Sequence, residues 1–232
     1  MPQRTAGAAF HKETLRFLVE LEANNEREWF QANKHRYERW VLAPALAFIE
    51  AMAPRIERLS KHLLAAPKRT GGSLMRIYRD TRFASDKTPY KTNIGIQFRH
   101  VRGRDVHAPG LYVHIEPDGC FLGAGIWHPE AEPLHKIRTR IAERPDAWRR
   151  ASRIKGFTER FALAGEQLSR PPRGFAATAA HVEDLKRKDF IAISRFHERE
   201  ALGAGFAGEV AARFKTAGPL MSFLCAALEL PY

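Results

Sequence analysis

The chain has 232 residues, of which 44% are hydrophobic and 28% are charged, proportions typical of a globular protein and not of a disordered one. Its 38 Lys and Arg residues exceed its 26 Asp and Glu residues, so the formal net charge of +12 favours polyanionic partners such as nucleic acid, unless the basic surface only aids solubility. Because no apolar stretch reaches the ~20 residues of a membrane span and no apolar leader follows Met1, we expect a cytoplasmic protein with no membrane partner.

The first quarter of the chain is predicted to be helical after a loose arm at residues 1–9. Apolar residues recur at helical spacing from His11 to Glu22. Asn24 or Asn25 is placed to cap a second helix whose first turn carries two glutamates, and Pro44 is expected to open a longer helix that runs through Leu63.

Two strand-like runs flank a charged segment in the middle of the chain. Leu74, Arg76 and Tyr78 alternate with Met75, Ile77 and Arg79. After the charged segment, Ile94, Ile96 and Phe98 alternate with Gly95, Gln97 and Arg99, and the two runs are predicted to be half-buried antiparallel strands. The segment between them, residues 80–93, mixes opposite charges with aromatic rings. Loops held by rigid strands often carry function, so this segment is the first candidate for a site.

The central segment offers more cations than carboxylates. The cations are Arg76, Arg79, Arg82, Lys87 and Lys91, and the carboxylates are Asp80 and Asp86. If the carboxylates orient the arginines, the remaining positive charge suits a phosphate-type oxyanion, because guanidinium groups match such anions and lysine adds a point charge. With Tyr90 as a hydroxyl donor, we predict an anion-binding site made of these five cations and this tyrosine. The alternative is an internal ion-pair network that fixes a long connection and binds no ligand.

Two more strands are predicted, from Leu111 to Ile115 and from Cys120 to Ile126, joined by a Glu116-Pro-Asp-Gly119 turn in which glycine accepts positive φ. His114 and Glu116 are two residues apart and share a face, so they could act as acid and base or bind a metal. No second group of ligands accompanies them, and we expect no metal site.

Two glycines near the predicted strands, and the two cysteines of the chain, can each be interpreted from the sequence. Gly123 and Gly125 could let a ligand or another backbone approach closely, although close strand packing explains them equally well. Cys120 and Cys225 form no CxxC motif and no obvious disulfide pair, which fits a reducing compartment and small residues in the core.

The second half of the chain begins with two basic helices, predicted from Glu130 to Arg144 and from Pro145 to Ile154. The stretch from Lys136 to Arg160 holds nine Lys or Arg residues against three Asp or Glu residues. These helices could lie along a phosphate backbone, or they could be ordinary solvated faces.

The remaining elements alternate between helix and strand. Residues 157–168 fit either a strand or a helix, and the Arg170-to-Phe175 stretch is irregular. A short helix from His181 to Lys188 precedes a strand from Phe190 to Ser194. The C-terminal helix that follows is expected to break near Gly218.

Five blocks of the chain resemble one family. They are RIYRDTRFASDKTPYKTNIGIQF at residues 76–98, NNEREWF at 24–30, APGLYVHIEP at 108–117, GAGIWHPE at 123–130 and PRGF at 172–175. By these blocks the chain is identified as a member of the bacterial and fungal family called domain of unknown function 2461, from Phe10 to the C-terminal helix. The resemblance implies one α+β domain with a shared site, and it supplies no catalytic residue and no cofactor. It also suggests that Arg173, in the PRGF block, brings one more cation to the central site.

We therefore expect an α+β fold with an antiparallel sheet of at least four strands and helices at both ends, in a single domain from residue 10 to residue 232. Three functions stay open. The protein could bind a phosphate-bearing ligand, nucleic acid included; it could be an enzyme for a small phosphorylated or carboxylated substrate, or a structural protein. In the enzyme, the proton would be moved by Asp80, Asp86, His114 or Glu116. The chain has no GxxxxGK[ST], HExxH or GxSxG motif, which favours binding.

Overall fold

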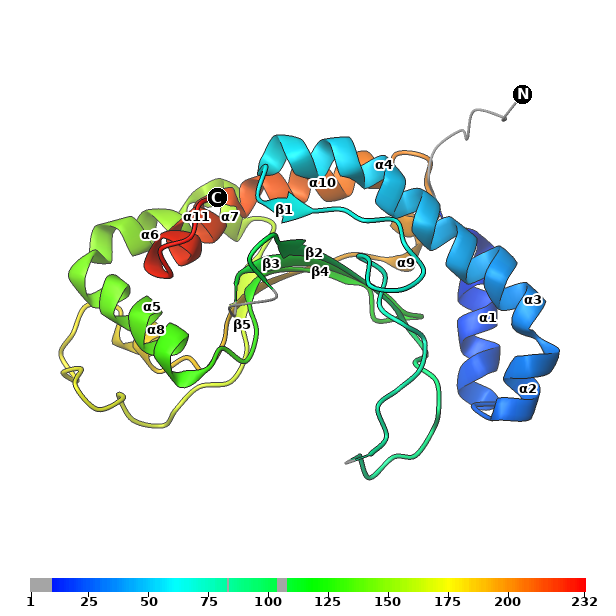
Figure 1. Ribbon diagram of the computed structural model, residues 1–232. Helices are drawn as coiled ribbons and strands as arrows, with labels where there is room; N and C mark the ends of the chain where they lie inside the picture. The colour runs from blue at the N-terminus through cyan, green and yellow to red at the C-terminus, as the bar shows by residue number, and fades with distance from the viewer. Residues whose placement is uncertain (1–9, 83, 104–107) are drawn as a thin grey trace.

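A curved antiparallel sheet organises the protein (Figure 1), seen in a computed structural model that describes residues 10–82, 84–103 and 108–232. The strands of the described residues lie in the order β1-β2-β3-β4-β6-β5, and every neighbouring pair is antiparallel. They are β1 (Leu63–Leu64), β2 (Ile94–His100), β3 (Gly110–Ile115), β4 (Phe121–Ile126), β5 (Ala162–Ala164) and β6 (Phe190–Arg195). The predicted α+β fold with at least four antiparallel strands is confirmed.

The first quarter of the chain is helical, as predicted. Its elements are α1 (Lys12–Ala23), α2 (Arg27–Ala32), α3 (Lys34–Tyr37), the π-helical turn η1 (Glu38–Leu42) and α4 (Ala43–Leu59). Two details of the prediction are wrong. The helix expected to run through Leu63 ends at Leu59, and Leu63 belongs to strand β1. The residue at the N-cap of α2 is Glu26, and neither Asn24 nor Asn25 caps that helix. Asn25 is instead engaged by a residue far along the chain, which no local pattern reveals.

The second half supplies the remaining helices. They are α5 (Ala131–Glu143), α6 (Pro145–Arg153), α7 (Lys155–Thr158), α8 (Val182–Leu185), α9 (Glu198–Ala201), α10 (Phe206–Thr216) and α11 (Gly218–Ala227). The ambiguous stretch at residues 157–168 contains both the end of α7 and the short strand β5. The predicted break near Gly218 separates α10 from α11.

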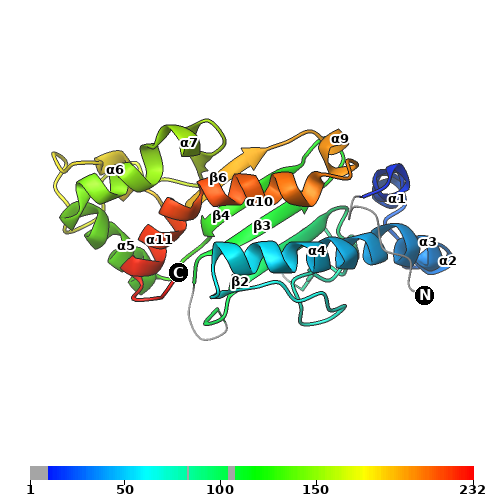
Figure 2. The same cartoon turned by 90° about the horizontal axis from the view of Figure 1, so that it is seen from above.

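The convex face of the sheet forms the main core. Alternate residues of the central strands point to this face and are buried: Ile94, Ile96 and Phe98 on β2, Leu111, Val113 and Ile115 on β3, and Leu122, Ala124 and Ile126 on β4. Helices α4 and α10 lie along the same face (Figure 2) and bring apolar residues such as Phe48, Met52, Val210 and Phe214 to it. Full burial of each large apolar side chain contributes about 1.5–3 kcal/mol, so this face dominates the folding energy.

The first of the two central runs does not form the strand that its alternation predicts. It makes only isolated bridges, Leu74 with Ile96 and Tyr78 with Tyr90. A continuous antiparallel ladder starting from the first bridge would place Tyr78 opposite Thr92, so the register shifts between the two bridges and the ladder is interrupted. The two runs are nevertheless antiparallel neighbours, since the Met75 N–H donates to the Gly95 carbonyl at 2.9 Å.

The predicted turn between β3 and β4 is present, with a different residue in the left-handed region. The Gly119 N–H donates to the Glu116 carbonyl at 3.2 Å, as expected of a tight turn. However, Asp118 has a φ of 58°, and Gly119 does not have positive φ. Aspartate tolerates this conformation better than most residues, because its short polar side chain can bond locally.

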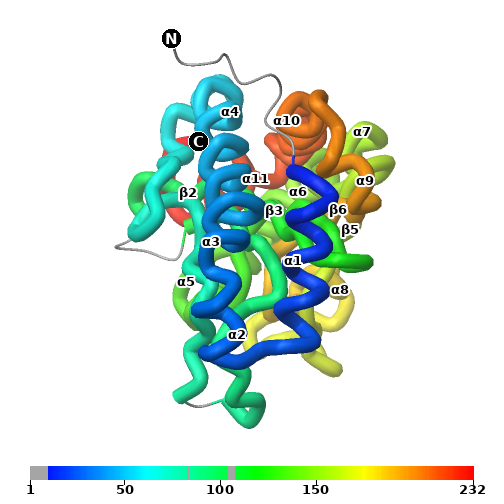
Figure 3. The backbone as a smooth tube through the Cα atoms, turned by 90° about the vertical axis from the view of Figure 1, so that its right-hand side faces the viewer, coloured from blue at the N-terminus to red at the C-terminus, as the bar shows by residue number. Residues whose placement is uncertain are grey.

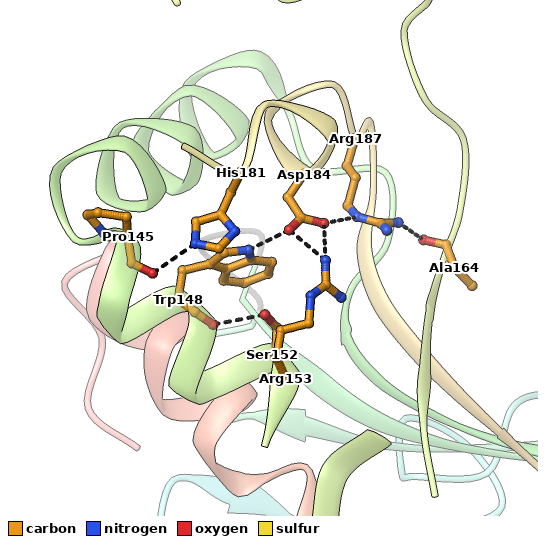
Figure 4. Close-up of polar contacts among 8 residues, drawn as sticks. All are labelled: Pro145, Trp148, Ser152, Arg153, Ala164, His181, Asp184 and Arg187. Atoms are coloured by element: carbon orange, nitrogen blue, oxygen red, sulfur yellow. Dashed lines mark hydrogen bonds and ion pairs between the residues drawn. The ribbon is translucent and has the colours of Figure 1, made fainter. Parts of the chain in front are cut away.

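A buried carboxylate ties the basic helices to the sheet (Figure 4). Asp184 on α8, 2% exposed, accepts hydrogen bonds from Trp148 Nε1 at 2.7 Å, Arg153 Nη2 at 2.9 Å and Arg187 Nε at 3.0 Å. Arg187 also donates to the carbonyl of Ala164 on β5 at 3.3 Å. Two guanidinium groups and one indole therefore satisfy a single carboxylate, and α6, α8 and β5 are fixed together.

Some expectations concern parts or properties that the fold does not test. The predicted arm at residues 1–9 lies outside the described residues, and the single domain from residue 10 stays a prediction. None of the described helices has the length and apolar character needed to cross a bilayer. Cys120 and Cys225 are buried free thiols, and burial raises the pKa of Cys225 to about 12.

Candidate functional site

Three of the five central cations have partners within their own segment. Arg79 pairs with Asp86 and donates to Thr88 Oγ1 at 2.5 Å. Arg82 grips Asp80 with two hydrogen bonds, Nε to Oδ1 at 3.0 Å and Nη2 to Oδ2 at 2.7 Å. Hydrogen bonds from Arg82 lower the pKa of Asp80 to about 2, so this carboxylate is ionised at neutral pH. The third cation, Lys87, donates through Nζ to the carbonyl of Thr81 at 2.9 Å.

The side chains of Arg76 and Lys91 differ from these three. Neither makes a hydrogen bond or an ion pair with any described residue. The Lys91 N–H donates to the carbonyl of Ile77 at 2.8 Å, which holds Lys91 beside the residue that follows Arg76. Partial burial lowers the pKa of Lys91, and the positive charge of Arg76 lowers it further. Two cations are thus held close together without an ion-pair partner among the described residues, and the carboxylate on which the charge of Arg76 acts, Asp80, is already bonded to Arg82.

Tyr90, predicted as a hydroxyl donor of this site, lies in the core. Its ring is 2% exposed and stacks on Phe30 of α2, with 4.1 Å between ring centroids. Figure 3 shows residues 76–82 and 84–91 projecting below the sheet, next to α2. Tyr90 therefore anchors the segment to the N-terminal helices.

Arg173 lies far from the central segment. The loop of residues 169–180 runs beside α5, on the opposite side of the concave face from residues 76–91 (Figure 1). Within that loop, the ring of Phe175 contacts His135 of α5 at 6.0 Å between centroids. The structure thus does not bring Arg173 to Arg76 or Lys91.

Most of the charge on the basic helices is used internally. Seven of the nine Lys and Arg residues between 136 and 160 have side-chain partners within the protein: Lys136 with Glu132, Arg138 with the Arg187 carbonyl, Arg140 with the Phe223 ring, Arg149 with Asp146, Arg153 with Asp184, Lys155 with Glu159 and Arg160 with Glu209. Among the described residues, the side chains of Arg144 and Arg150 have no such partner. Five of the nine cations are thus paired with a carboxylate. Of the other four, Arg138 is buried and Arg140 lies over a ring, which leaves Arg144 and Arg150 as the cations most open to a nucleic acid.

The concave face of the sheet holds a hollow of about 990 Å³. Side chains that alternate with the buried ones form its floor and walls, among them Gln97, Tyr112, His114, Phe121, Ile193 and Trp127. Register places Tyr112 between Gln97 and Gly123, and Gly123 in turn beside Ile193, in one row across four strands. A volume of this size accommodates a small organic molecule.

A hydrogen-bonded chain of three side chains lies along β3 in this hollow. The hydroxyl of Tyr112 is 3.0 Å from His114 Nδ1, and His114 Nε2 is 3.1 Å from Glu116 Oε2. An ionised Glu116 can only accept, so His114 carries its proton on Nε2, and Nδ1 accepts from the Tyr112 hydroxyl. Burial raises the pKa of Tyr112 to about 12, and the charge of Glu116 acts in the same direction.

Neighbouring residues hold this chain in place. The ring of His114 stacks on Phe121 at 4.5 Å and its side chain is 14% exposed. Thr92 Oγ1 donates to Glu116 Oε1 at 3.2 Å, and Asn93 Nδ2 lies 3.4 Å from His114 Nδ1. The His114 and Glu116 side chains, chosen from the sequence as an acid-base candidate, are thus in direct contact. Sequence reasoning missed Tyr112, although its position two residues before His114 places it on the same strand face.

The fold is that of an α+β protein with one sheet face covered by helices and a hollow on the other face. The chain belongs to the conserved hypothetical protein family DUF2461, whose family model matches residues 13–223. Comparison with curated proteins and with solved structures gives no match. In the part of the chain that the structure describes, no group of three or more His, Cys, Asp or Glu side chains could hold a metal ion.

Proposed function

We propose that this protein binds a small phosphate- or carboxylate-bearing molecule through Arg76 and Lys91. The observation that carries the proposal is the proximity of these two cations without an ion-pair partner among the described residues. Like charges at short range destabilise a partly buried site, and a bound anion would remove that cost while gaining charge-assisted hydrogen bonds. The guanidinium would supply a planar pair of donors, and the ammonium a mobile one.

The other charged residues of the segment support this site indirectly. Asp80 and Asp86 hold Arg82 and Arg79 in place, as expected of orienting groups, and so neutralise those two arginines. Three cations remain, and of these Lys87 is held by the Thr81 carbonyl, so Arg76 and Lys91 are the two whose side chains have no hydrogen bond or ion pair among the described residues. This narrows the anion-binding prediction from the whole segment to two residues.

A nucleic-acid partner receives less support from the structure. Binding along a phosphate backbone needs a row of unneutralised cations, because each contact releases a counterion. On the basic helices only Arg144 and Arg150 lack side-chain partners among the described residues. A compact ligand with one or two anionic groups fits two adjacent cations better than a polymer does.

Thermal unfolding with added anions tests the proposal. Inorganic phosphate, malonate and glucose 6-phosphate are added to the wild type, to Arg76→Gln and to Lys91→Gln, with Arg150→Gln as a control that removes an exposed cation elsewhere. A ligand at about 100 times its Kd stabilises by roughly 2.7 kcal/mol, which raises the Tm of a domain of this size by several degrees. We expect this rise in the wild type and in Arg150→Gln, and its loss in the other two variants. An equal rise in all four proteins would exclude this site.

A further inference from the structure

We propose that the hollow on the concave face of the sheet is a second binding site, which takes a planar aromatic ring carrying an N–H or O–H donor. The ring lies on the backbone of β4 at Gly123, and its donor meets the oxygen of Tyr112. This site does not depend on Arg76 or Lys91, and it has a different ligand chemistry.

Two glycines of β4, Gly123 and Gly125, leave the floor of the hollow without side chains. The backbone requires glycine at only one of these two positions. Gly125 has a φ of +125°, and a Cβ on it would stand 2.0 Å from the Phe190 carbonyl, so the sheet itself requires glycine at that position. Gly123 is different, since its φ is not in the left-handed region and its Cβ would meet nothing closer than Tyr112 Cβ at 3.4 Å. The fold would therefore accept a larger residue at position 123.

A glycine that the backbone does not need still weakens a strand interior, because it loses more entropy on folding and packs no side chain. Its effect at position 123 is to leave the space above the sheet empty. Tyr112 and Ile193 are its cross-strand neighbours on this face, and both line the hollow. The backbone at Gly123 is thus a flat surface that lies below the level of the neighbouring Tyr112 and Ile193 side chains. A planar ring could lie on it with its face against the backbone.

The walls match the same kind of ligand. Phe121, Ile191 and Ile193 line the hollow together with Trp127, whose side chain stands at the end of β4 and is 68% exposed. An indole so exposed on a mostly apolar wall gains by contact with another aromatic ring. The hollow is also lined by charged residues, among them Arg99, Glu132 and Lys136. The preference for an aromatic ring therefore rests on the apolar side chains beside Gly123, which offer contact to a ring face.

The hydrogen-bonded chain on β3 sets the polarity of the contact. Glu116 accepts from His114, and His114 accepts from the Tyr112 hydroxyl. The Asn93 side chain also bonds the Tyr112 oxygen, which leaves that oxygen one lone pair for a further donor. A Cβ on Gly95 would stand 2.7 Å from this hydroxyl, so glycine there makes room for it. In a hydrogen bond between the ligand and the Tyr112 oxygen, the ligand must therefore be the donor.

Three matched probes test the site by amide chemical shifts of the full-length protein. 4-Hydroxybenzoate has the ring and the donor, benzoate has the ring alone, and cyclohexanecarboxylate has no planar ring. We expect 4-hydroxybenzoate to shift the amides of Gly123 and Phe121 at the lowest concentration, benzoate to need more, and cyclohexanecarboxylate to leave them unchanged. No shift with either aromatic acid, or equal shifts with all three acids, would overturn the proposal.

Three variants separate this site from the one at Arg76. Gly123→Ala places a methyl group on the floor, and we expect 4-hydroxybenzoate to bind at least about tenfold more weakly while the Tm is no lower than in the wild type. Tyr112→Phe should abolish the preference for 4-hydroxybenzoate over benzoate. Arg76→Gln should leave the binding of both acids in the hollow unchanged. Unaltered binding in Gly123→Ala, or loss of binding in Arg76→Gln, would contradict a separate ring-binding floor.

Discussion

The side chain of Asn25 bonds both backbone groups of Tyr90, although the two residues are 65 positions apart. Asn25 Oδ1 accepts from the Tyr90 N–H at 3.0 Å, and Asn25 Nδ2 donates to the Tyr90 carbonyl at 2.9 Å. The amide of Asn25 carries its donor and its acceptor on separate atoms, so it can bond both backbone groups at once. The Asn25 side chain thereby bonds the backbone of Tyr90 as a neighbouring strand would, at the point where the central segment leaves the sheet.

Replacing Asn25 by Ala should destabilise the protein by about 1–3 kcal/mol, because two partly buried backbone groups lose their partner. Urea unfolding measures the change. Asn24→Ala is the matched control, since Asn24 makes one exposed hydrogen bond, to the carbonyl of Glu20 at 2.9 Å, and its loss should cost less than half as much. Equal costs for the two variants would contradict the role assigned to Asn25.

Asp184→Ala should be among the most damaging single changes, at about 3–5 kcal/mol, because it leaves Arg187 and the Trp148 indole without their buried acceptor. The same unfolding experiment applies. Asp146→Ala removes a carboxylate from an exposed pair with Arg149 on the same helix, and we expect less than about 0.5 kcal/mol. A mild effect at Asp184 would show that the helices dock without it.

The pKa of Lys91 should rise toward its ordinary value of 10.5 in Arg76→Gln, because burial and the charge of Arg76 both lower it in the wild type. An NMR titration of the dimethylated lysines measures the shift. In the wild type, the unfolded chain keeps the Lys91 proton in the pH window where the folded chain has lost it. The free energy of unfolding therefore increases as the pH rises from the lowered pKa of folded Lys91 toward 10.5. In Arg76→Gln the two pKa values should lie closer together, so this pH range should be narrower. An unchanged pKa would mean that the two cations are too far apart to share one anion.

Alkaline pH should unfold the protein in a tyrosine-dependent way. Burial raises the pKa of Tyr37, Tyr112 and Tyr232 to about 12 from an ordinary value of 10.0. Because the folded state holds these protons more tightly than the unfolded state, the stability that they confer is present below pH 10.0 and is lost as the pH rises through about 12. Tyrosine absorbance at 295 nm, followed with pH, should show late ionisation in the wild type. The slope of stability with pH should be shallower in Tyr112→Phe, and an identical slope would contradict the raised pKa of Tyr112.

The strands of the sheet could be predicted from alternation because only one face is buried. Leu111 to Ile115, Cys120 to Ile126 and Phe190 to Ser194 are each found within a residue or two of the expected bounds. The same rule fails for Leu74 to Arg79, since a register shift set by distant partners interrupts the ladder. Burial in this run does not follow the alternation either, because Leu74 and Ile77 are buried while Met75 and Tyr78 are exposed.

The sites were less accessible to sequence reasoning than the strands. Residue types predicted the contact between His114 and Glu116, which is local to one strand. The partnering of Arg79 and Arg82, which leaves Arg76 and Lys91 without partners, depends on how the segment folds back on itself. The hollow depends on neighbours drawn from four strands, as when Gly123 comes to lie between Tyr112 and Ile193. Such sets are fixed by pairing between distant segments, which one sequence does not reveal.

The two margins of the sheet have a consequence for association between molecules. Its outermost strands are β1, with two residues, and β5, with three, and residues 73–79 lie along part of β2 beside β1. A foreign strand needs a long row of open N–H and C=O groups to attach to a sheet, and these short margins offer few. The protein can thus leave the concave face of its sheet uncovered by helices and still resist growth into fibrils by strand addition.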